Sequence, residues 1–321
     1  MSAALLVTAQ PVTAPPVTAP TFRPTFRLKE RAADCYTPRM RKSSLLRLFA
    51  AVLLCGGAWV AYTQGQQAPP QLKINKIKDN LFEIENDGGN VSVYVTGEGV
   101  ILVDDKFDRD HDEIMSLVKS VTAEPIKYIV NTHHHQDHTG GNAKMEPMNP
   151  QIISTEEARE NMVEGKMSGL PSITIATRGR IHLGGKTVEM YHYGRSHTNG
   201  DAVVLFPEHR VLAAGDMFTR GNDFPPLIDY AGGGSAREWT KTLDDVMKLD
   251  FDVVIPGHGA VGVKKDMLEF RSLMVDLRSR VHQMDVEKKS RDEISKMLVS
   301  QFHFGQLQLL RGLDGVIAEM Q

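Results

Sequence analysis

The sequence has 321 residues, of which 41% are hydrophobic, so it is long enough for one large domain or two ordinary ones with a buried core. The formal net charge of −3 is uneven, because residues 66–321 carry 29 basic and 38 acidic side chains. An acidic body without a long Lys/Arg run excludes a nucleic-acid binder that relies on electrostatic attraction.

The N-terminal 65 residues are predicted to lie outside the fold. Residues 11–20 repeat the pentapeptide PVTAP, and Pro/Thr/Ala tracts of this kind bury too little apolar surface to become ordered, so residues 1–39 are expected to be a disordered extension. Residues 40–65 have a basic start, an apolar run of about 13 residues and then small and polar residues, which is the order of a secretory signal peptide. We therefore expect translation to start at Met40 and the mature protein to be periplasmic or secreted, without stable membrane embedding. A single N-terminal membrane anchor is the alternative.

Cysteine chemistry is excluded from the predicted mature protein. Both cysteines, Cys35 and Cys55, lie in the leader, so no thiol remains for a disulfide or for a metal. All twelve histidines lie beyond residue 65. Any metal must therefore be held by histidine and carboxylate side chains.

From residue 71 onward, strand-like and helix-like segments alternate, which predicts a mixed α and β fold. Strands are expected at the apolar runs 72–77, 81–86, 91–96, 100–105, 126–131, 151–155, 180–184, 187–193, 202–206, 210–215 and 253–257. Helices are expected over 109–121, 155–165 and 236–248, the last with a capping box of Ser235 and Glu238. A helical block from residue 264 to the end has apolar side chains at helical spacing, which indicates core contacts. We expect residues 71–262 to form the main domain, with residues 263–321 as helices packed on it or appended to it.

The stretch NTHHHQDHTGG, residues 131–141, directly follows a predicted strand. Two histidines separated by one residue on an extended segment point the same way, so His133 and His135 can reach one metal while His134 faces the other side. Asp137 and His138 follow on the turn, where they can serve a second ion. The alternative is a surface patch of histidines, which predicts no further ligands elsewhere in the chain.

Three more candidate ligands stand where predicted strands end in loops, namely His197, Asp216 and His258. A lone histidine or aspartate at a strand end is usually a cap or a solvated loop residue. Together with the cluster at 133–138, however, the three complete the coordination that two metal ions need.

These motifs resemble those of the metallo-β-lactamase superfamily. HHHQDH matches the HxHxDH pattern of the superfamily, and SHTNGD, AAGD and PGHG match its later ligand motifs in the right order, while ILVDD resembles its first motif. The resemblance covers about residues 75–260. It implies an α/β (α+β) fold, a four-layer αβ/βα sandwich with a metal centre at the edge where the loops meet, here followed by a C-terminal helical extension.

The resemblance also implies a ligand set, position by position. The first metal would be held by His133, His135 and His197, the second by Asp137, His138 and His258, and Asp216 would bridge the two. Asp104, at the end of ILVDD, and Asp201 would fix the imidazole tautomers from behind. The expected cofactors are two Zn²⁺ ions per chain, although iron and manganese also suit these ligands.

The implied function is a secreted dinuclear zinc hydrolase, in which a hydroxide bridging the metals attacks an ester, lactone or amide bond, with that of a β-lactam among the candidates. Asp137 is the expected acid/base residue. Asp216 stands where many antibiotic-hydrolysing members have Cys or Ser, so the pattern is closer to the glyoxalase II, lactonase and general hydrolase branches. Thr219 stands where lactonases often have Tyr, and the layout after Asp216 also resembles the lactamase branch, so a β-lactamase proper is one alternative. Another is a mononuclear iron sulfur dioxygenase that would use His133, His197 and Asp216.

Two loops are expected to select the substrate, because loops carry specificity on a rigid scaffold. Residues 219–235 include Phe224, Leu227, Ile228 and Tyr230, and residues 165–172 are expected to form the opposite wall. Neither loop has the clustered Arg/Lys pair that a phosphate or a glutathione carboxylate would need. We therefore expect a small-molecule substrate and no nucleic-acid partner.

Overall fold

The computed structural model describes residues 71–321 of the chain. The predicted extension over 1–39 and the predicted signal peptide over 40–65 lie outside the described residues, as do both cysteines. In the described part, none of the helices combines the length and the apolar composition that crossing a bilayer requires.

The first sheet has seven strands in chain order. Neighbours from β1 to β4 are antiparallel, whereas β4 to β7 run parallel. All four residues of β4 are buried, as expected for a strand that is covered on both faces. The strands are β1 Lys73–Lys78, β2 Leu81–Glu85, β3 Val91–Val95, β4 Val100–Val103, β5 Ile126–Val130, β6 Gln151–Thr155 and β7 Ile173–Ile175.

The second sheet has six strands in the order β13-β12-β11-β10-β9-β8. All its neighbours are antiparallel except β11 and β12, which run parallel. The strands are β8 Arg178–Leu183, β9 Lys186–Tyr191, β10 Val203–Phe206, β11 Val211–Ala213, β12 Val253–Ile255 and β13 Gly262–Val263. The sequence patterns had not predicted β7 as a defined strand, or β13, because runs of three and two residues are too short to show alternation.

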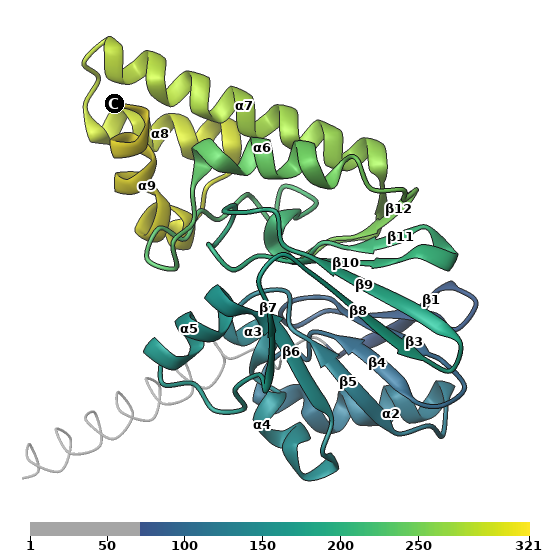
Figure 1. Cartoon of the computed structure of the whole chain (residues 1–321). Coiled ribbons are helices and arrows are strands. Elements are labelled where there is room, and N and C mark those ends of the chain that lie inside the picture. The colour runs from purple at the N-terminus through teal and green to yellow at the C-terminus, as the bar shows by residue number, and fades with distance from the viewer. Residues whose placement is uncertain (1–70) are drawn as a thin grey trace, which may run out of the picture. The chain divides into compact units, whose positions relative to one another are not determined.

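Helices cover the outer face of each sheet (Figure 1). Those between β4 and β9 are α2 His111–Val121, α3 Gln136–Thr139, α4 Asn142–Met145 and α5 Glu156–Glu164, and those after β11 are α6 Ala236–Val246, α7 Lys264–Val286, α8 Arg291–Phe302 and α9 Gln306–Met320. Short 3₁₀ turns are η1 Asp108–Asp110, η2 Glu146–Met148, η3 Pro207–His209 and η4 Gly215–Met217. The helices predicted over 109–121, 155–165 and 236–248 thus agree with α2, α5 and α6 to within two residues.

Three apolar clusters separate the four layers. Ile114 and Val118 of α2 pack on the outer face of the first sheet. A second cluster, which includes Tyr94 and Phe206, fills the space between the sheets. A third includes Trp239 of α6 and joins the second sheet to the C-terminal helices. The predicted αβ/βα sandwich with C-terminal helices is therefore confirmed.

The C-terminal helical block consists of three helices, α7, α8 and α9. Ser290 caps α8 by accepting a hydrogen bond from the Glu293 amide, and the Glu293 carboxylate in turn accepts one from the Ser290 amide. His303 then ends α8 in the left-handed conformation, with a φ of 58°. The predicted capping box at the start of α6 is only half formed, because Ser235 accepts from the Glu238 amide whereas its own amide donates to the Ser196 carbonyl.

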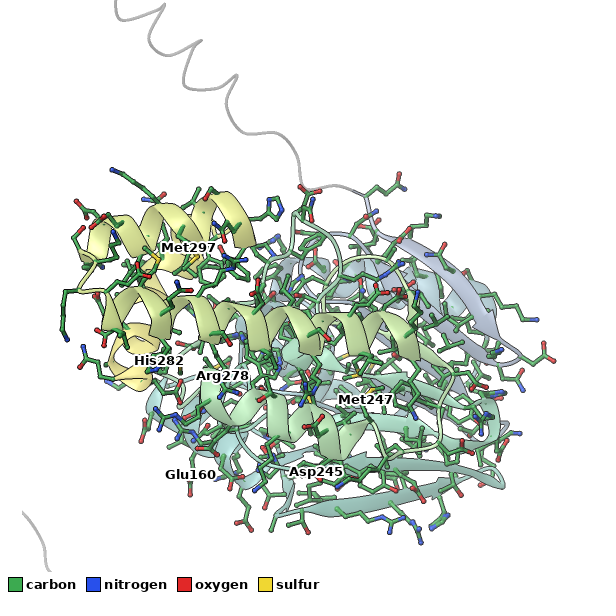
Figure 2. All side chains as sticks on the ribbon, turned by 90° about the horizontal axis from the view of Figure 1, so that it is seen from above. Glu160, Asp245, Met247, Arg278, His282 and Met297 are labelled. Carbon is green, nitrogen blue, oxygen red and sulfur yellow. The ribbon has the colours of Figure 1, made fainter. Side chains whose placement is uncertain are left out.

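Hydrogen bonds connect α7 to its neighbours, and Figure 2 shows α7 from above with Arg278 and His282 labelled. Arg278 donates from Nη1 to Thr240 Oγ1 of α6 at 2.7 Å, and His282 Nδ1 donates to the Met320 carbonyl at the end of α9 at 2.9 Å. These hydrogen bonds fix the orientation of α7 against its neighbours. Apolar contacts also hold the helix, since its Met274 and Leu277 are buried.

Candidate metal centre

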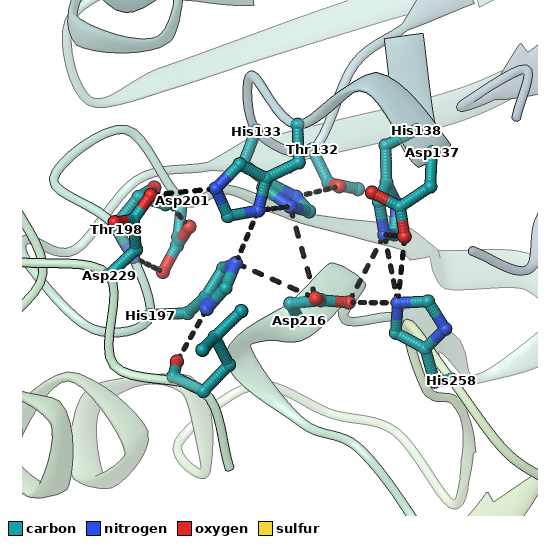
Figure 3. A network of polar contacts seen from close by, with 12 residues as sticks. Thr132, His133, Asp137, His138, His197, Thr198, Asp201, Asp216, Asp229 and His258 are labelled. Carbon is teal, nitrogen blue, oxygen red and sulfur yellow. Dashed lines mark hydrogen bonds and ion pairs between the residues drawn. The ribbon is translucent and has the colours of Figure 1, made fainter. Parts of the chain in front are cut away.

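The candidate ligands lie on loops that leave both sheets at the same edge. The segment 133–138 follows β5 and continues into α3, His197 follows β9, Asp216 lies in η4 after β11, and His258 follows β12. Strands hold the ends of these loops, so side chains up to 125 residues apart meet in one cluster (Figure 3).

The first group of ligands is His133, His135, His197 and Asp216, whose donor atoms all lie within 4.8 Å of one another. Nδ1 of His135 is 3.2 Å from Nε2 of His133 and 2.9 Å from Nε2 of His197. Asp216 Oδ2 lies 3.5 Å from His197 Nε2 and 4.0 Å from His133 Nε2. Three imidazole nitrogens and a carboxylate oxygen thus converge on one point.

Hydrogen bonds on the far side of two rings set the direction of the converging nitrogens. His197 Nδ1 donates to the Leu227 carbonyl at 2.6 Å, so its Nε2 is free to act as a ligand. His133 Nδ1 lies 3.0 Å from Thr132 Oγ1, and this hydroxyl gives its own proton to Asp104 Oδ2 at 2.8 Å. The hydroxyl therefore accepts from His133, which again leaves Nε2 with its lone pair.

His135 is oriented by a carboxylate that the sequence motifs had not indicated. Its Nε2 lies 2.8 Å from Oδ2 of Asp229, so this nitrogen donates and Nδ1 turns toward the first group. Asp229 is buried, and although burial raises its pKa, the hydrogen bond and charge of His135 together with Arg311 hold the pKa well below its ordinary value. The carboxylate is thus charged and suited to support a metal-binding imidazole.

The second group is Asp137, His138 and His258. Asp137 Oδ2 lies 3.2 Å from His258 Nε2 and 3.7 Å from His138 Nε2. Asp216 Oδ1, the other oxygen of the carboxylate in the first group, lies 3.2 Å from His138 Nε2 and 3.3 Å from His258 Nε2. Asp216 therefore stands between the two groups, with one oxygen directed at each.

The donor set fits divalent metal ions. Asp216 Oδ1 is buried and makes no regular hydrogen bond among the described residues; its nearest groups are the two imidazoles at 3.2 and 3.3 Å, so it needs positive charge beside it, which a metal ion would supply. Nitrogens bound tetrahedrally to one Zn²⁺ at 2.0–2.1 Å would be roughly 3.3 Å apart, close to the separations between the converging imidazoles. The seven residues of the two groups could therefore hold two neighbouring ions, and His134 with His135 and Asp229 forms a third set of possible donors that shares His135 with the first group.

The carboxylates in and beside the second group also favour positive charge on the groups around them. Burial opposes the charge on His138 and on His258, but the surrounding carboxylates raise the pKa of His138 well above 6.5 and that of His258 to about 9. Burial likewise works against the charge of Asp137, but the neighbouring imidazolium groups hold its pKa below the ordinary range. Protonated imidazoles can balance the negative charge of these carboxylates. Bound metal ions would balance the same charge and would take the place of the protons.

The sequence profile of the metallo-beta-lactamase superfamily matches residues 84–258, more than half of the chain and all seven candidate ligands. The chain belongs to this superfamily. A type 2 metallo-beta-lactamase of Bacillus cereus is 24% identical over 261 residues, which cover 73% of this chain and 99% of that protein. The alpha subunit of a 2,4-dinitroanisole O-demethylase from Nocardioides is 24% identical over 200 residues, 60% of each chain.

Solved structures agree with this assignment. A metallo-beta-lactamase from Pontibacter korlensis superimposes with a TM-score of 0.58 at 22% identity, covering 64% of this chain and 99% of that one. The DIM-1 metallo-beta-lactamase gives a TM-score of 0.58 at 23% identity, covering 65% of this chain and 99% of that one. The metallo-beta-lactamase fold is therefore shown, and the chain is a metal-dependent hydrolase of this superfamily.

Of the two predicted supporting carboxylates, Asp104 contacts a ligand ring and Asp201 does not. Asp104 Oδ2 accepts from His138 Nδ1 at 2.8 Å. Asp201 instead accepts from the Ser196 hydroxyl at 2.5 Å and from the Thr198 amide at 2.9 Å, so among the described residues it touches no candidate ligand's imidazole. Asp201 shapes the turn that carries His197, and the prediction that it fixes a tautomer was wrong.

His134 lies outside the two ligand groups that share Asp216, although its ring lies close to His135 and Asp229. Its Nδ1 lies 3.4 Å from Asn161 Nδ2, and burial lowers the pKa of the ring to about 3. The side chain lines the substrate cavity as a neutral group.

A cavity of about 1360 Å³ opens over the metal centre. Both predicted loops contribute to it, with Phe224 and Leu227 from 219–235 and Met167 from 165–172. Of the other two apolar residues expected there, Ile228 is buried in the core cluster and Tyr230 donates to Glu319 of α9 at 2.7 Å. The wall formed by α9, through Leu307, Gln308 and Arg311, was not foreseen.

One side of the cavity is a glycine-containing loop over residues 86–90. The buried Lys106 donates from Nζ to the carbonyls of Asn86 and Gly89, each at 2.6 Å. A Cβ on Gly89 would lie 2.2 Å from the His138 ring. Only glycine therefore lets this backbone pass so close to a candidate ligand.

Proposed function

We propose that this protein is a dinuclear zinc hydrolase that cleaves an ester, lactone or amide bond, including that of a β-lactam, in a small-molecule substrate. The observation that carries the proposal is the position of Asp216, whose two carboxylate oxygens face two complete ligand groups at 3.2–4.0 Å. A shared carboxylate of this kind is suited to hold two ions close together.

The metal ions, when bound, would acidify a water molecule and polarise the carbonyl group of the substrate. The chain supplies the groups around this chemistry. Asp137 lines the cavity and its Oδ2 lies between His138 and His258, so it is placed to orient the attacking water and to accept its proton. The buried rings of His133 and His138 keep bulk water from the inner side of the centre.

A β-lactam is the first substrate to test, because the curated relatives that match over 73% of the chain are named as β-lactamases. The carboxylate at position 216 favours a broader panel, since it does not follow the Cys or Ser of many lactamases. A periplasmic or secreted location, inferred from residues 40–65, would suit either substrate class. No nucleic acid is expected as a substrate.

The oxidoreductase alternative would need a single iron held by His133, His197 and Asp216. Nothing in such a mechanism requires the second group, yet Asp137, His138 and His258 are equally well assembled. We therefore favour hydrolysis.

The test is a panel of β-lactam, lactone, thioester and phosphodiester substrates, assayed with metal-free protein to which zinc is added stepwise. The proposal expects hydrolysis that saturates at two Zn²⁺ per chain and disappears with a chelator. One iron per chain in the purified protein, with oxygen uptake and no hydrolysis, would establish the oxidoreductase instead. Hydrolysis that persists after complete removal of metal would disprove the proposal.

A further inference from the structure

The C-terminal helix α9 brings a guanidinium group to the metal centre. Arg311 Nη1 lies 3.3 Å from Asp229 Oδ2 and 3.0 Å from His135 Nε2, although 176 residues separate Arg311 from His135. The side chain of Arg311 is 40% exposed and lines the cavity. The segment matched by the superfamily profile ends at residue 258, so Arg311 lies beyond that segment.

Arg311 is the one basic side chain of the described cavity lining outside the candidate ligands and His134. Among the described residues that line the cavity, Arg311 is the only arginine or lysine. Of the lining acids outside the ligand groups, Glu85 pairs with Lys73 at 3.0 Å and Asp87 with Arg109 at 2.8 Å. Glu164 and Asp223 remain without an ion-pair partner among the described residues. Apart from the candidate metal centre itself, the cavity therefore offers an anion one positively charged side chain, next to the first ligand group.

The contact with Asp229 leaves donors of Arg311 unused. A guanidinium has five N–H donors, and only Nη1 makes a hydrogen bond to a described residue. The Asp229 side chain is 6% exposed and is hydrogen-bonded to His135. The Arg311 side chain, by contrast, is 40% exposed and lines the cavity. The free edge can bind a planar carboxylate through two parallel hydrogen bonds.

Apolar side chains frame this position. Leu307 lies one turn before Arg311 on α9 and lines the cavity with Leu227 and Met167. They offer contact area to a hydrocarbon body but no charge. The unpaired acids farther out would repel a second negative charge.

We propose that Arg311 is a specificity residue that binds the carboxylate of the substrate. The substrate class is then an ester, lactone or amide with an apolar body and a single carboxylate, held on the side of the His133, His135 and His197 group. This inference rests on the proposed hydrolase function, because it concerns the same cavity.

The test compares two p-nitrophenyl esters that differ only in charge, the monoester of glutaric acid and the ester of pentanoic acid. For the wild-type zinc-loaded protein we expect kcat/KM to be at least 10-fold higher for the anionic ester. Arg311→Gln should lower kcat/KM for the anionic ester about 10-fold, mainly through KM, and leave the neutral ester within 2-fold. Arg311→Lys should recover part of the preference. The matched control is Leu310→Ala, because Leu310 neighbours Arg311 but is 81% exposed and does not line the cavity.

A structural role of Arg311 through Asp229 predicts a different result. In that case Arg311→Gln would lower the zinc content, measured by mass spectrometry, and both esters would lose activity equally. That outcome, or a wild-type protein with no preference for the anionic ester, would overturn the proposal.

A binding measurement separates failure of this inference from failure of the proposed function. If the wild type hydrolyses neither ester, calorimetric titration with 5-phenylpentanoate and with its amide still reports on Arg311. Tighter binding of the acid in the wild type that is lost in Arg311→Gln supports the carboxylate site, even without hydrolysis. Equal preference for the acid in both proteins would place the carboxylate on the metal and contradict the role of Arg311.

Discussion

Asp104 Oδ2 accepts a hydrogen bond from Nδ1 of His138 at 2.8 Å, and the same carboxylate holds the amide and the hydroxyl of Thr132 at 2.8 Å each. Through Thr132 it also sets the orientation of His133. One buried aspartate thus supports an imidazole in each of the two ligand groups. Such a carboxylate matters for metal binding although it touches no metal itself.

Replacing Asp104 should therefore weaken both groups. For Asp104→Ala we expect a roughly 10- to 100-fold loss of zinc affinity and a similar loss of activity at limiting zinc. Competition with a chromogenic chelator measures the affinity. Asp108→Ala is a suitable control, because Asp108 is an exposed carboxylate on the same segment. Unchanged zinc affinity in Asp104→Ala would show that Thr132 and His138 keep their orientation without it.

The neighbours His134 and His135 offer a sharp comparison, because both are histidines in the same loop and only one belongs to the first group. His135→Ala should remove one zinc per chain and reduce kcat at least about 100-fold, since a ligand is lost. His134→Ala should retain two zinc ions per chain and change mainly KM, because this ring lines the cavity. Metal analysis and steady-state kinetics on the two variants decide the matter. Loss of metal from His134→Ala would assign this ring to the centre.

The stability of the protein should fall as the pH rises through the titration of Glu83. This carboxyl group is 2% exposed, and burial raises its pKa from 4.5 to about 7. The folded state therefore holds a proton that the unfolded state releases between these two values, so the free energy of unfolding decreases over this range. At about 1.4 kcal/mol for each pH unit over roughly 2.5 units, the loss is at most about 3.5 kcal/mol.

Glu83→Gln removes this titration and should be more stable than the wild type at pH 8, but not at pH 4. Urea unfolding at both pH values measures the difference. Glu146→Gln, at an exposed position, controls for the general effect of removing a charge. Parallel pH dependence in the wild type and in Glu83→Gln would contradict the assignment.

In the last turn of α9, the Glu319 carboxylate is hydrogen-bonded to residues of the segment 230–237. Glu319 accepts hydrogen bonds from the hydroxyls of Tyr230 and Ser235 and from the amide of Arg237. Glu319→Ala should cost about 1–3 kcal/mol of unfolding free energy, because donors lose their acceptor. It should also reduce the preference for the anionic ester, since α9 carries Arg311.

The control for Glu319→Ala is Asp314→Ala on the same helix, where an exposed ion pair with Arg291 contributes little. Thermal melting and the ester comparison should both distinguish the two variants. If Glu319→Ala lowered stability without affecting the ester preference, α9 would hold its position through its apolar face alone.

The ligand residues could be predicted from the sequence because each follows an apolar strand within a short local pattern. Position after a strand places a side chain at the sheet edge, whatever the rest of the fold does. The strand and helix pattern predicted only a mixed α and β fold, and the layer arrangement was implied by the motif resemblance. Helix ends were correct to within two residues where apolar spacing was regular, as in α2 and α6.

Asp229 and Arg311 could not be found in this way. Asp229 lies 94 residues from the histidine that it supports and has no motif around it. Arg311 looks like an ordinary charged residue of an amphipathic helix, and only the packing of α9 against residues 229–237 brings it to the cavity. Asp201, by contrast, lies close to His197 in sequence but points into its own turn, since the nearest donors there are Ser196 and Thr198.

The separation of α9 from the ligand loops along the chain has a consequence for how this protein can diversify. The residues that assemble the metal centre are encoded between positions 84 and 258, whereas the helix that completes the cavity is encoded after position 305. If Arg311 selects the substrate as proposed, a recombination that exchanged only the final segment would change the substrates that bind. The candidate metal ligands would stay the same. Natural variants with grafted tails, or chimaeras made in the laboratory, could thus acquire new substrates without passing through an inactive ancestor.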